Sequence, residues 1–221
     1  MTREARHQHA RELTRRAILD AALALFLENG YDHVSMRNIA ARVEYSPAAL
    51  YGYFASKDEI VYALAEEGYR LLGAKQITAS ASDDPLDDVR NAAWRLYEFS
   101  KEQPQYFALV FLDRRVPSIG RDFERFPFML EMKQRLIAQM QRCISTGALP
   151  ATLNAQVAVR LLWAPIFGIA TLCLSERIPG GEHADGLVRD AIETTIAGLR
   201  VTLPRYSAPV AVPERAASSS S

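Results

Sequence analysis

The stretch from Ser35 to Ile60, SMRNIAARVEYSPAALYGYFASKDEI, contains two closely spaced helix starts ahead of a third. Ser35 and Ser46 can each cap a helix, because a serine hydroxyl accepts a hydrogen bond from an orphan backbone amide. Pro47 follows Ser46 at the first helical position, where its missing N–H costs nothing. Only about two helical turns fit between the two caps. Helices this short, joined by tight turns, favour a helix-turn-helix over an ordinary bundle.

The third helix of this unit is predicted to begin at Lys57. Ser56 and Glu59 have the spacing of a capping box, in which the serine and the acid each satisfy an orphan amide. The apolar period then continues through Leu64 toward Leu71. We expect this helix to connect the unit to the rest of the chain and to transmit conformational changes along it.

The middle helix has a small, apolar and acid-free outer face. Leu50 and Phe54 lie four residues apart and can pack inward. The positions that are left mostly on the outer side are Pro47, Ala48, Ala49, Tyr51 and Tyr53. The proline and the two alanines can contact thymine methyl groups, but they form no bidentate hydrogen bonds to bases. The unit therefore has the properties of a DNA-reading element.

These residues resemble the N-terminal domain of the TetR/AcrR family of bacterial transcriptional regulators. The family pattern is matched by Ser35, Ile39, Ala40, Ser46, Leu50, Tyr51, Tyr53, Phe54 and Lys57, and its first helix by Ile18, Ala21, Ala22, Leu25, Phe26, Gly30 and Tyr31. The resemblance covers roughly the first third of the chain. It departs at Glu44, which stands where the family usually has glycine. Because glycine alone adopts a positive φ without strain, we expect a strained or reshaped turn at this position.

The resemblance implies a ligand-responsive repressor that binds a palindromic operator in double-stranded DNA as a homodimer and is released by a small-molecule effector. It also implies an all-α fold of about nine helices, in which a three-helix helix-turn-helix domain precedes a helical ligand-binding and dimerisation domain. We expect an N-terminal arm and DNA-binding domain at 1–56, a connecting helix at 57–77, a C-terminal domain at 78–203 and a disordered tail at 204–221.

A second, shorter resemblance lies in the C-terminal half of the chain. Leu162-Trp163-Ala164 with Phe167-Gly168 is similar to the Trp, His, Gly signature of one class of C-terminal domain in the same family. Phe167 stands in place of the histidine. The C-terminal domains of this family diverge widely, so this match does not identify the effector.

The expected DNA contacts are Ser35, Arg37, Ser46, Pro47, Ala48, Ala49, Tyr51, Tyr53 and Lys57. Tyr51, Tyr53 and Lys57 can donate to phosphate oxygens, which would position the protein without reading sequence. Tyr53 can instead pack in the domain core. Arg37 and Arg42 are candidates for the DNA backbone or a base edge, and surface ion pairs are the equal alternative.

Basic residues are concentrated before the helix-turn-helix. The formal net charge of the chain is zero, with 26 basic and 26 acidic residues. The segment from Met1 to Arg16 nevertheless has five arginines against two glutamates, namely Arg3, Arg6, Arg11, Arg15 and Arg16 against Glu4 and Glu12. Such an arm can lie along phosphates or enter a minor groove. A solvated, frayed terminus is the equal alternative.

The C-terminal helices are rich in aromatic and methionine side chains, which tolerate a variable void. We expect an effector cavity lined by some of Trp94, Tyr97, Phe107, Phe111, Phe128, Met132, Met140, Trp163 and Phe167, although each of these can also be ordinary core. Few charged residues fall on the inward faces of these helices. This pattern predicts an apolar or weakly polar effector.

The last two predicted helices carry more apolar surface than one bundle needs. We expect the dimer interface to include Ala158, Leu162, Ile166, Ile192, Thr195, Ile196 and Leu199. The same residues could instead form the core within one chain.

No catalytic or metal-binding constellation is present in the sequence. The four histidines are scattered, and neither a phosphate loop nor a nucleophile motif occurs, so we expect no enzyme activity, metal or cofactor. The longest uncharged run, Leu161–Ser175, is too short to span a bilayer, and the N-terminus lacks a signal-peptide core. We therefore expect a cytoplasmic protein without a membrane segment. The remaining alternative is an all-helical small-molecule binding module without functional DNA binding.

Overall fold

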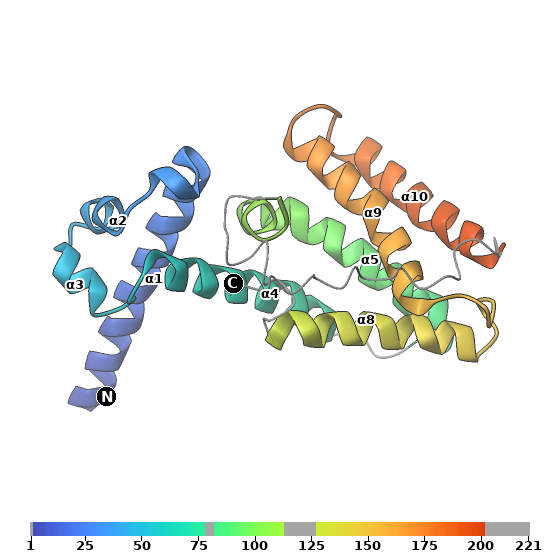
Figure 1. The fold of residues 1–221 in the computed structure, drawn as a ribbon, viewed down its shortest axis with the longest axis horizontal. Coiled ribbons are helices and arrows are strands. Elements are labelled where there is room, and N and C mark those ends of the chain that lie inside the picture. Colours follow the sequence, from blue (N-terminus) through green and yellow to red (C-terminus); the bar gives the residue numbers. More distant parts are fainter. Residues whose placement is uncertain (1, 78–81, 113–126, 202–221) are drawn as a thin grey trace, which may run out of the picture.

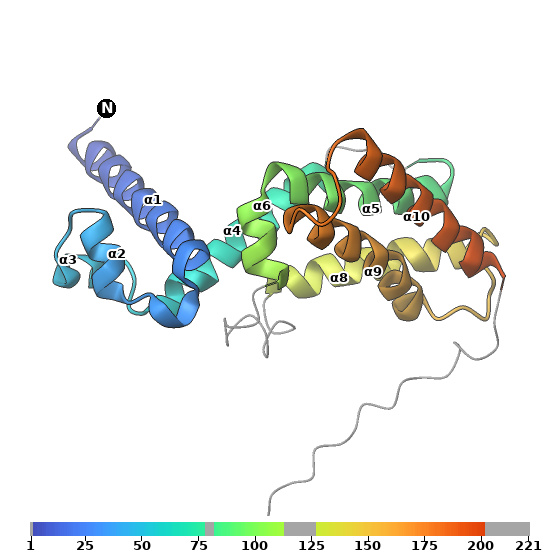
Figure 2. The ribbon, with the colours of Figure 1, turned by 90° about the horizontal axis from the view of Figure 1, so that it is seen from above.

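The structure is a computed structural model that describes residues 2–77, 82–112 and 127–201. Within these ranges all regular elements are helical, and nine of them are α-helices, so the predicted all-α fold is confirmed. A small N-terminal group of helices stands beside a larger C-terminal bundle, and α4 (Lys57–Ile77) runs from one to the other (Figure 1). Figure 2 shows the same arrangement from above. The tail expected at 204–221 lies outside the described residues.

The N-terminal domain consists of α1 (Arg3–Asn29), the one-turn helix η1 (Tyr31–His33), α2 (Met36–Arg42) and α3 (Pro47–Tyr51). Ser35 and Ser46 are the N-caps of α2 and α3, as predicted. The hydroxyl oxygen of Ser35 accepts a hydrogen bond from the Asn38 amide at 3.2 Å, and the Asn38 side chain accepts one from the Ser35 amide at 2.9 Å. The hydroxyl oxygen of Ser46 accepts from the Ala49 amide at 3.1 Å. These bonds fix where both short helices begin.

α1 begins much earlier than the predicted arm allows. The Thr2 hydroxyl accepts a hydrogen bond from the Ala5 amide at 3.3 Å, and the helix continues from there to Asn29. Its buried residues start at Ile18, so the preceding turns project as exposed helix (Figure 1). The Arg-rich segment is neither frayed nor extended, because its alanines, arginines and glutamates favour helix. A helix about 10 Å wide is too broad for a minor groove about 6 Å wide, so the segment is not the extended arm that was expected there, and its contact with DNA stays a prediction.

The turn between α2 and α3 keeps the shape that glycine usually provides. Glu44 has a φ of 58°, which lies in the left-handed region. The Glu44 amide donates to the Ala41 carbonyl at 3.2 Å, and the Tyr45 amide donates to the Ala40 carbonyl at 2.9 Å. This pair of bonds is the Schellman motif that ends a helix. The prediction of a strained turn at Glu44 is therefore confirmed.

α4 (Lys57–Ile77) starts with a shifted version of the predicted capping box. The Ser56 hydroxyl accepts from the Glu59 amide at 3.1 Å, as expected. The Glu59 carboxylate accepts from the Ala55 amide at 2.5 Å, one residue before the position predicted. Leu64, fully buried on α4, joins the core of the molecule.

The C-terminal domain is a bundle around α5. Its elements are α5 (Pro85–Glu102), α6 (Pro104–Phe107), the π-helical turn η2 (Ala108–Leu112), α8 (Pro127–Ser145), α9 (Ala155–Leu174) and α10 (Glu182–Arg200). Asp84 and Asn154 cap α5 and α9 by accepting hydrogen bonds from backbone amides at 2.9 and 3.0 Å. α5 packs against α4, α8, α9 and α10, while α9 and α10 pack side by side along their length (Figure 1).

α9 is longer than the uncharged run in the sequence, because the helix includes Arg160 and the residues before it. An 18-residue stretch of this 20-residue helix has a mean hydropathy of 2.0, so the helix is long and apolar enough to cross a membrane by length and composition alone. A core helix of a soluble protein meets the same criteria, so the expectation of no membrane segment stays a prediction. In the fold α9 packs on α5, α8 and α10. Only 28% of its apolar window is buried, so the helix leaves much of its apolar surface uncovered.

Candidate nucleic-acid interface and ligand cavity

α3 presents the face that the sequence predicts. Leu50 is fully buried, whereas Pro47, Ala48 and Ala49 are exposed. Tyr51 is 54% exposed, so its hydroxyl can reach a partner outside the chain. The placement of these side chains fits a helix that enters a groove, while their contact with DNA stays a prediction.

Two arginines of α1 brace the end of α3, a contact that the sequence pattern does not predict. The Arg11 guanidinium donates to the Gly52 carbonyl at 3.2 Å and lies 5.5 Å from the centre of the Tyr53 ring. The Arg15 guanidinium lies 5.0 Å from the centre of the Phe54 ring. Tyr53 is half-buried and packs against the core. This position agrees better with the alternative of core packing than with a contact to phosphate. A cation beside the C-terminal end of α3 also complements the helix dipole.

The two arginines of α2 differ in their partners. Arg42 forms an ion pair with Glu28 at 3.1 Å, which is the surface alternative that the sequence left open. Arg37 is exposed and forms no ion pair within the described part of the chain. Arg37 is therefore the better placed of the two for an external anion.

Lys57 is held by the backbone of the N-terminal domain. Its ammonium donates to the carbonyls of Tyr31 and Val34 at 2.7 and 2.9 Å and lies 3.8 Å from the centre of the Tyr31 ring. The Tyr31 hydroxyl in turn donates to Asp58, and burial followed by this bond raises the pKa of Tyr31. An ammonium has three donors, so one remains for a phosphate. Lys57 joins α4 to the end of η1, and its predicted phosphate contact is untested.

Arg16 links the DNA-binding domain to the C-terminal domain. It pairs with Asp20 on its own helix at 2.7 Å and with Glu67 on α4, and it donates to the Tyr106 hydroxyl at 3.2 Å. Burial, together with a hydrogen bond to Glu67, raises the pKa of Tyr106 to about 12. Tyr106 therefore stays neutral and hydrogen-bonded at neutral pH. One side chain thus reaches α1, α4 and α6.

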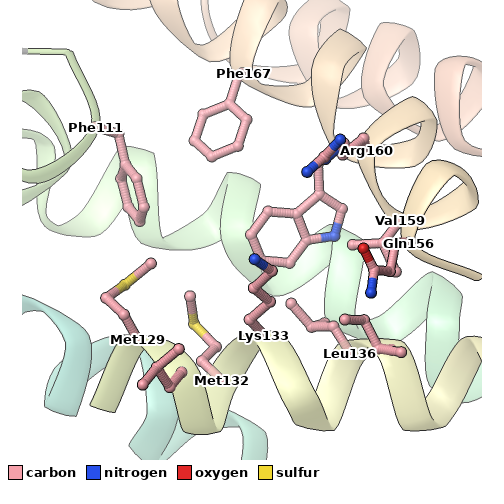
Figure 3. A pocket seen from close by; sticks show the side chains of 12 residues that line it. Phe111, Met129, Met132, Lys133, Leu136, Gln156, Val159, Arg160 and Phe167 are labelled. Atoms are coloured by element: carbon pink, nitrogen blue, oxygen red, sulfur yellow. The ribbon is translucent and has the colours of Figure 1, made fainter. Parts of the chain in front are cut away.

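The C-terminal domain contains a cavity of about 260 Å³ between η2, α8 and α9 (Figure 3). It is lined by Phe111, Met129, Leu130, Met132, Lys133, Leu136, Ile137, Gln156, Val159, Arg160, Trp163 and Phe167. Four of the predicted ligand residues are among them: Phe111, Met132, Trp163 and Phe167. The aromatic side chains on α9 that the sequence singled out therefore do face a cavity.

The other five predicted ligand residues lie elsewhere. Tyr97, Phe107 and Met140 are at most 1% exposed and belong to the core. Phe128 stacks on Tyr69 of α4 with 4.9 Å between ring centres. Trp94 faces away from the cavity toward α10, where the Arg189 guanidinium lies 4.8 Å from its ring. Helical periodicity placed all five on apolar faces, but it did not show which apolar face borders a void.

The cavity also contains polar side chains that were not predicted. Lys133, Gln156 and Arg160 line it, but Gln156 and Arg160 are exposed and Lys133 is half-buried, so the expectation of few charged inward positions stays a prediction. A signal was available, because Gln156, Arg160, Trp163 and Phe167 repeat at three-and-four spacing and share one face of α9. That face points into the cavity.

Most of the residues predicted for the dimer interface are buried inside their own chain. The six that are at most 6% exposed are Ala158, Leu162, Ile166, Ile192, Ile196 and Leu199. The seventh, Thr195, is half-buried and donates to a carbonyl of its own helix at 2.7 Å. Six of these residues thus form the intrachain core that the sequence left as an alternative, because α9 and α10 pack on each other through them. A neighbouring face of α9 is uncovered and carries Leu161, Ala164, Gly168 and Leu172.

Comparisons with known proteins agree with this architecture. Residues 18–64 match the family described as bacterial regulatory proteins, tetR family. The HTH-type transcriptional regulator YdeS of Bacillus subtilis is 24% identical over 193 residues, which cover 86% of this chain and 92% of YdeS. The HTH-type transcriptional repressor KstR of Rhodococcus jostii is 44% identical over 110 residues, covering 42% of this chain and 51% of KstR.

A solved structure has the same fold over most of its length. The SmeT–triclosan complex superposes with a TM-score of 0.63 and 22% sequence identity. The match covers 84% of this chain and 91% of SmeT. The likeness therefore extends through the N-terminal helices and the C-terminal bundle alike.

Proposed function

The chain belongs to the TetR/AcrR family of transcriptional regulators, and from this premise we propose that it is a dimeric repressor released from its operator by a small molecule. Family membership makes it a DNA-binding regulator and not an enzyme. The observation that carries the proposal is α3, a short helix with two fixed ends and an exposed, acid-free face. The similarity to KstR, a transcriptional repressor, supports repression over activation. Because its ligand is chromosomal DNA, we place the protein in the cytoplasm.

Each α3 would enter one major groove of a palindromic site. Pro47, Ala48 and Ala49 would lie against base edges, and apolar contacts of this kind favour thymine methyl groups. Tyr51 and Arg37 would reach phosphates on either side and fix the register of the helix. Specificity would therefore come from shape and methyl contacts more than from bidentate hydrogen bonds.

Dimerisation is proposed through the uncovered face of α9 with the adjoining face of α10. On α9, Leu161 and Leu172 are 40% and 37% exposed, and Gly168 would have open space around an added Cβ. On α10, Leu187 is 40% exposed. A stable dimer buries about 1,200–2,000 Å² in total, which two paired helices of this length can supply. The small residues between the leucines would let the helices of two chains approach closely.

The cavity and the DNA-reading face are joined by α4. The ring of Phe111, which lines the cavity, lies 5.2 Å from Phe167 and 5.6 Å from Tyr69 of α4. One residue earlier on α4, a Cβ added to Gly68 would lie 3.2 Å from both Tyr106 and Val110, so the helices are in close contact. An effector that moves Phe111 would therefore shift α4 and the spacing of the paired α3 helices. Ligand control requires only a differential affinity of about 1–3 kcal/mol between the two spacings.

Selection of bound duplexes from a random library at low salt tests the proposal directly. We expect enrichment of a palindrome whose half-sites lie one helical turn, about 34–36 Å, apart, with protection of both half-sites in a footprint. Recovery of no preferred sequence, together with no protection, would contradict the repressor proposal. It would leave the protein as an all-helical small-molecule binding module.

A further inference from the structure

The two ends of the α8–α9 cavity differ in chemistry. Figure 3 shows aromatic and sulfur-containing side chains at one end and polar side chains at the other. The apolar end is made by Phe111, Met129, Met132 and Phe167. Gln156 and Arg160 lie at the polar end, and Lys133 lies between that end and the methionines. A ligand that fills this cavity meets both environments at once.

The polar end is positive. Among the described residues that line the cavity, Lys133 and Arg160 are charged and none is acidic. Arg160 forms no ion pair with any residue of the described ranges. Glu131, an acid on the same helix as Lys133, is exposed and paired with Arg135 at 2.5 Å. Arg160 and Gln156 are exposed and Lys133 is half-buried, so solvent reaches this end of the cavity and weakens the attraction of an anion relative to a dry interior.

The size of the cavity limits the ligand. At roughly 30 Å³ for each water-sized group, 260 Å³ holds on the order of ten non-hydrogen atoms. This volume suits a short alkyl chain or one substituted ring with a single small polar group. A ligand with several charged groups would leave some of them against Phe167 and the methionines, where desolvation disfavours charge.

We propose that the cavity binds an amphipathic monocarboxylate, with its apolar body between Phe111 and Phe167 and its carboxylate between Lys133 and Arg160. A guanidinium can hold a carboxylate through two parallel hydrogen bonds, and the Gln156 amide supplies a further donor. A neutral ligand of the same shape would bring no negative charge to the Arg160 guanidinium. Binding of this ligand in the cavity does not depend on the proposed function. Its role as the effector that releases DNA rests on the proposed function.

The first test compares three compounds with the same alkyl chain and different head groups. Octanoate, octanol and octylamine are titrated into the full chain without DNA, and binding is followed by tryptophan fluorescence because Trp163 lines the cavity. We expect octanoate to bind at least about tenfold more tightly than octanol, with octylamine weakest. Octanol or octylamine binding as tightly as octanoate would overturn the proposal.

The second test removes the two cations one at a time. Arg160→Gln and Lys133→Gln should each weaken octanoate binding by about 10–100-fold and change octanol binding by no more than about twofold. Arg135→Gln on the exposed side of α8 is the matched control, and it should leave octanoate binding unchanged. Octanoate affinity that survives both cavity substitutions would overturn the assignment of the carboxylate site. Thermal unfolding of each variant shows that the fold is retained.

Release of DNA is measured separately, so that failure of either proposal can be recognised. Octanoate that binds with the expected dependence on Arg160 supports the site even if the protein is found to bind no duplex. A neutral compound that displaces the operator and competes with octanoate for the cavity at higher affinity would overturn the carboxylate preference while leaving the repressor proposal intact.

Discussion

The DNA-reading domain and the C-terminal cavity are built in different ways. In the reading domain, bonds between residues a few positions apart, such as Ser46 to Ala49, determine where each short helix begins. In the C-terminal domain, the cavity walls come from α8, α9 and η2, and residues far apart in sequence meet there. The short-range bonds of the reading domain fix its backbone and leave the side chains on its outer face free. The packing of the C-terminal helices leaves a void whose chemistry depends on which helical faces meet.

This difference has a functional consequence. The reading face has few contacts of its own, so its geometry depends on caps and on braces such as Arg11 and Lys57. The cavity lies in a bundle that can exchange side chains at its lining without losing the surrounding core. A regulator built in this way can keep a fixed reading geometry while its effector specificity changes.

The largest expected effect is loss of the dimer, which would separate the two reading helices. Gly168→Arg adds a charged side chain to the uncovered face of α9, where an added Cβ meets no atom of its own chain within 4 Å. We expect a folded monomer in sedimentation and an operator affinity lower by about 10²–10⁴-fold, because the linkage between two half-sites is lost. Gly73→Arg on α4, where an added Cβ also meets open space, is the control. An unchanged dimer in the Gly168 variant would contradict the proposed interface.

The second prediction tests whether the two regions unfold separately. Leu50→Ala removes a fully buried side chain from α3 and should destabilise the reading domain by about 2–5 kcal/mol. Both tryptophans, Trp94 and Trp163, lie in the C-terminal domain, so their fluorescence reports unfolding of that domain. We expect Leu50→Ala to shift the helical circular dichroism transition and to leave the tryptophan transition in place.

The matched substitution in the C-terminal core is Leu96→Ala, since Leu96 is equally buried in α5. It should shift the tryptophan transition by a similar free energy. Equal shifts of both probes in the Leu50 variant would show that the two regions form one cooperative unit.

Lys57 gives an intermediate effect that separates a structural role from a DNA-binding role. Lys57→Ala removes the side-chain donor of the Val34 carbonyl and one of the two donors of the Tyr31 carbonyl, and it should lower the free energy of unfolding by about 1–3 kcal/mol. If the third donor also binds a phosphate, binding to all sequences should weaken alike. The slope of log affinity against log salt should then fall by about one unit, because one phosphate is no longer neutralised.

Arg37→Ala is the comparison, because Arg37 has no ion pair within the described residues. It should reduce the salt slope and leave stability unchanged. A stability loss without any change of slope in the Lys57 variant would remove Lys57 from the set of phosphate-binding residues.

The smallest expected effect concerns two helix ends, one in each region. Glu44 and Glu176 have φ values of 58° and 56°, and both follow helices that end in the same pair of backbone bonds. Glu44→Gly and Glu176→Gly should each stabilise the fold by about 0.5–1 kcal/mol, because relief of left-handed strain exceeds the entropy gained by the unfolded chain. Chemical denaturation of both variants measures this. Destabilisation at Glu44 alone would show that its side chain has a contact that strain relief does not replace.

Short-range signals in the sequence were sufficient for the reading domain. The caps at Ser35 and Ser46 and the buried Leu50 follow from residues within one or two turns of each other, whereas the strain at Glu44 was expected from the glycine that the resembling family usually has there. The braces by Arg11 and Lys57 did not follow, because these contacts join residues 41 and 26 positions apart. Nor did the pattern show that the Arg-rich segment before Ile18 is helical.

The cavity and the proposed interface were less predictable, because periodicity shows that a helical face is apolar without showing what covers it. Phe107 and Phe111 are both phenylalanines and lie four positions apart, yet Phe107 is fully buried and Phe111 lines the void. Leu162, expected at the dimer interface, is buried within its own chain, whereas its neighbour Leu161, for which no role was predicted, is 40% exposed. Arg160 was not predicted to line the cavity, because it precedes the uncharged run that starts at Leu161 and therefore marks, in the sequence, where the apolar segment begins.

The most direct measurement of the central claim is the affinity of Ala49→Asp for the selected duplex. Ala49 lies in the first turn of α3 on its exposed face, where an acid stabilises the helix dipole, so the variant should remain folded. If α3 enters the groove, the new carboxylate meets the negative DNA, and fluorescence anisotropy should show loss of binding at low salt while Ala138→Asp on α8 binds normally. Wild-type affinity in a folded Ala49→Asp protein would contradict the assignment of α3 as the DNA-reading helix.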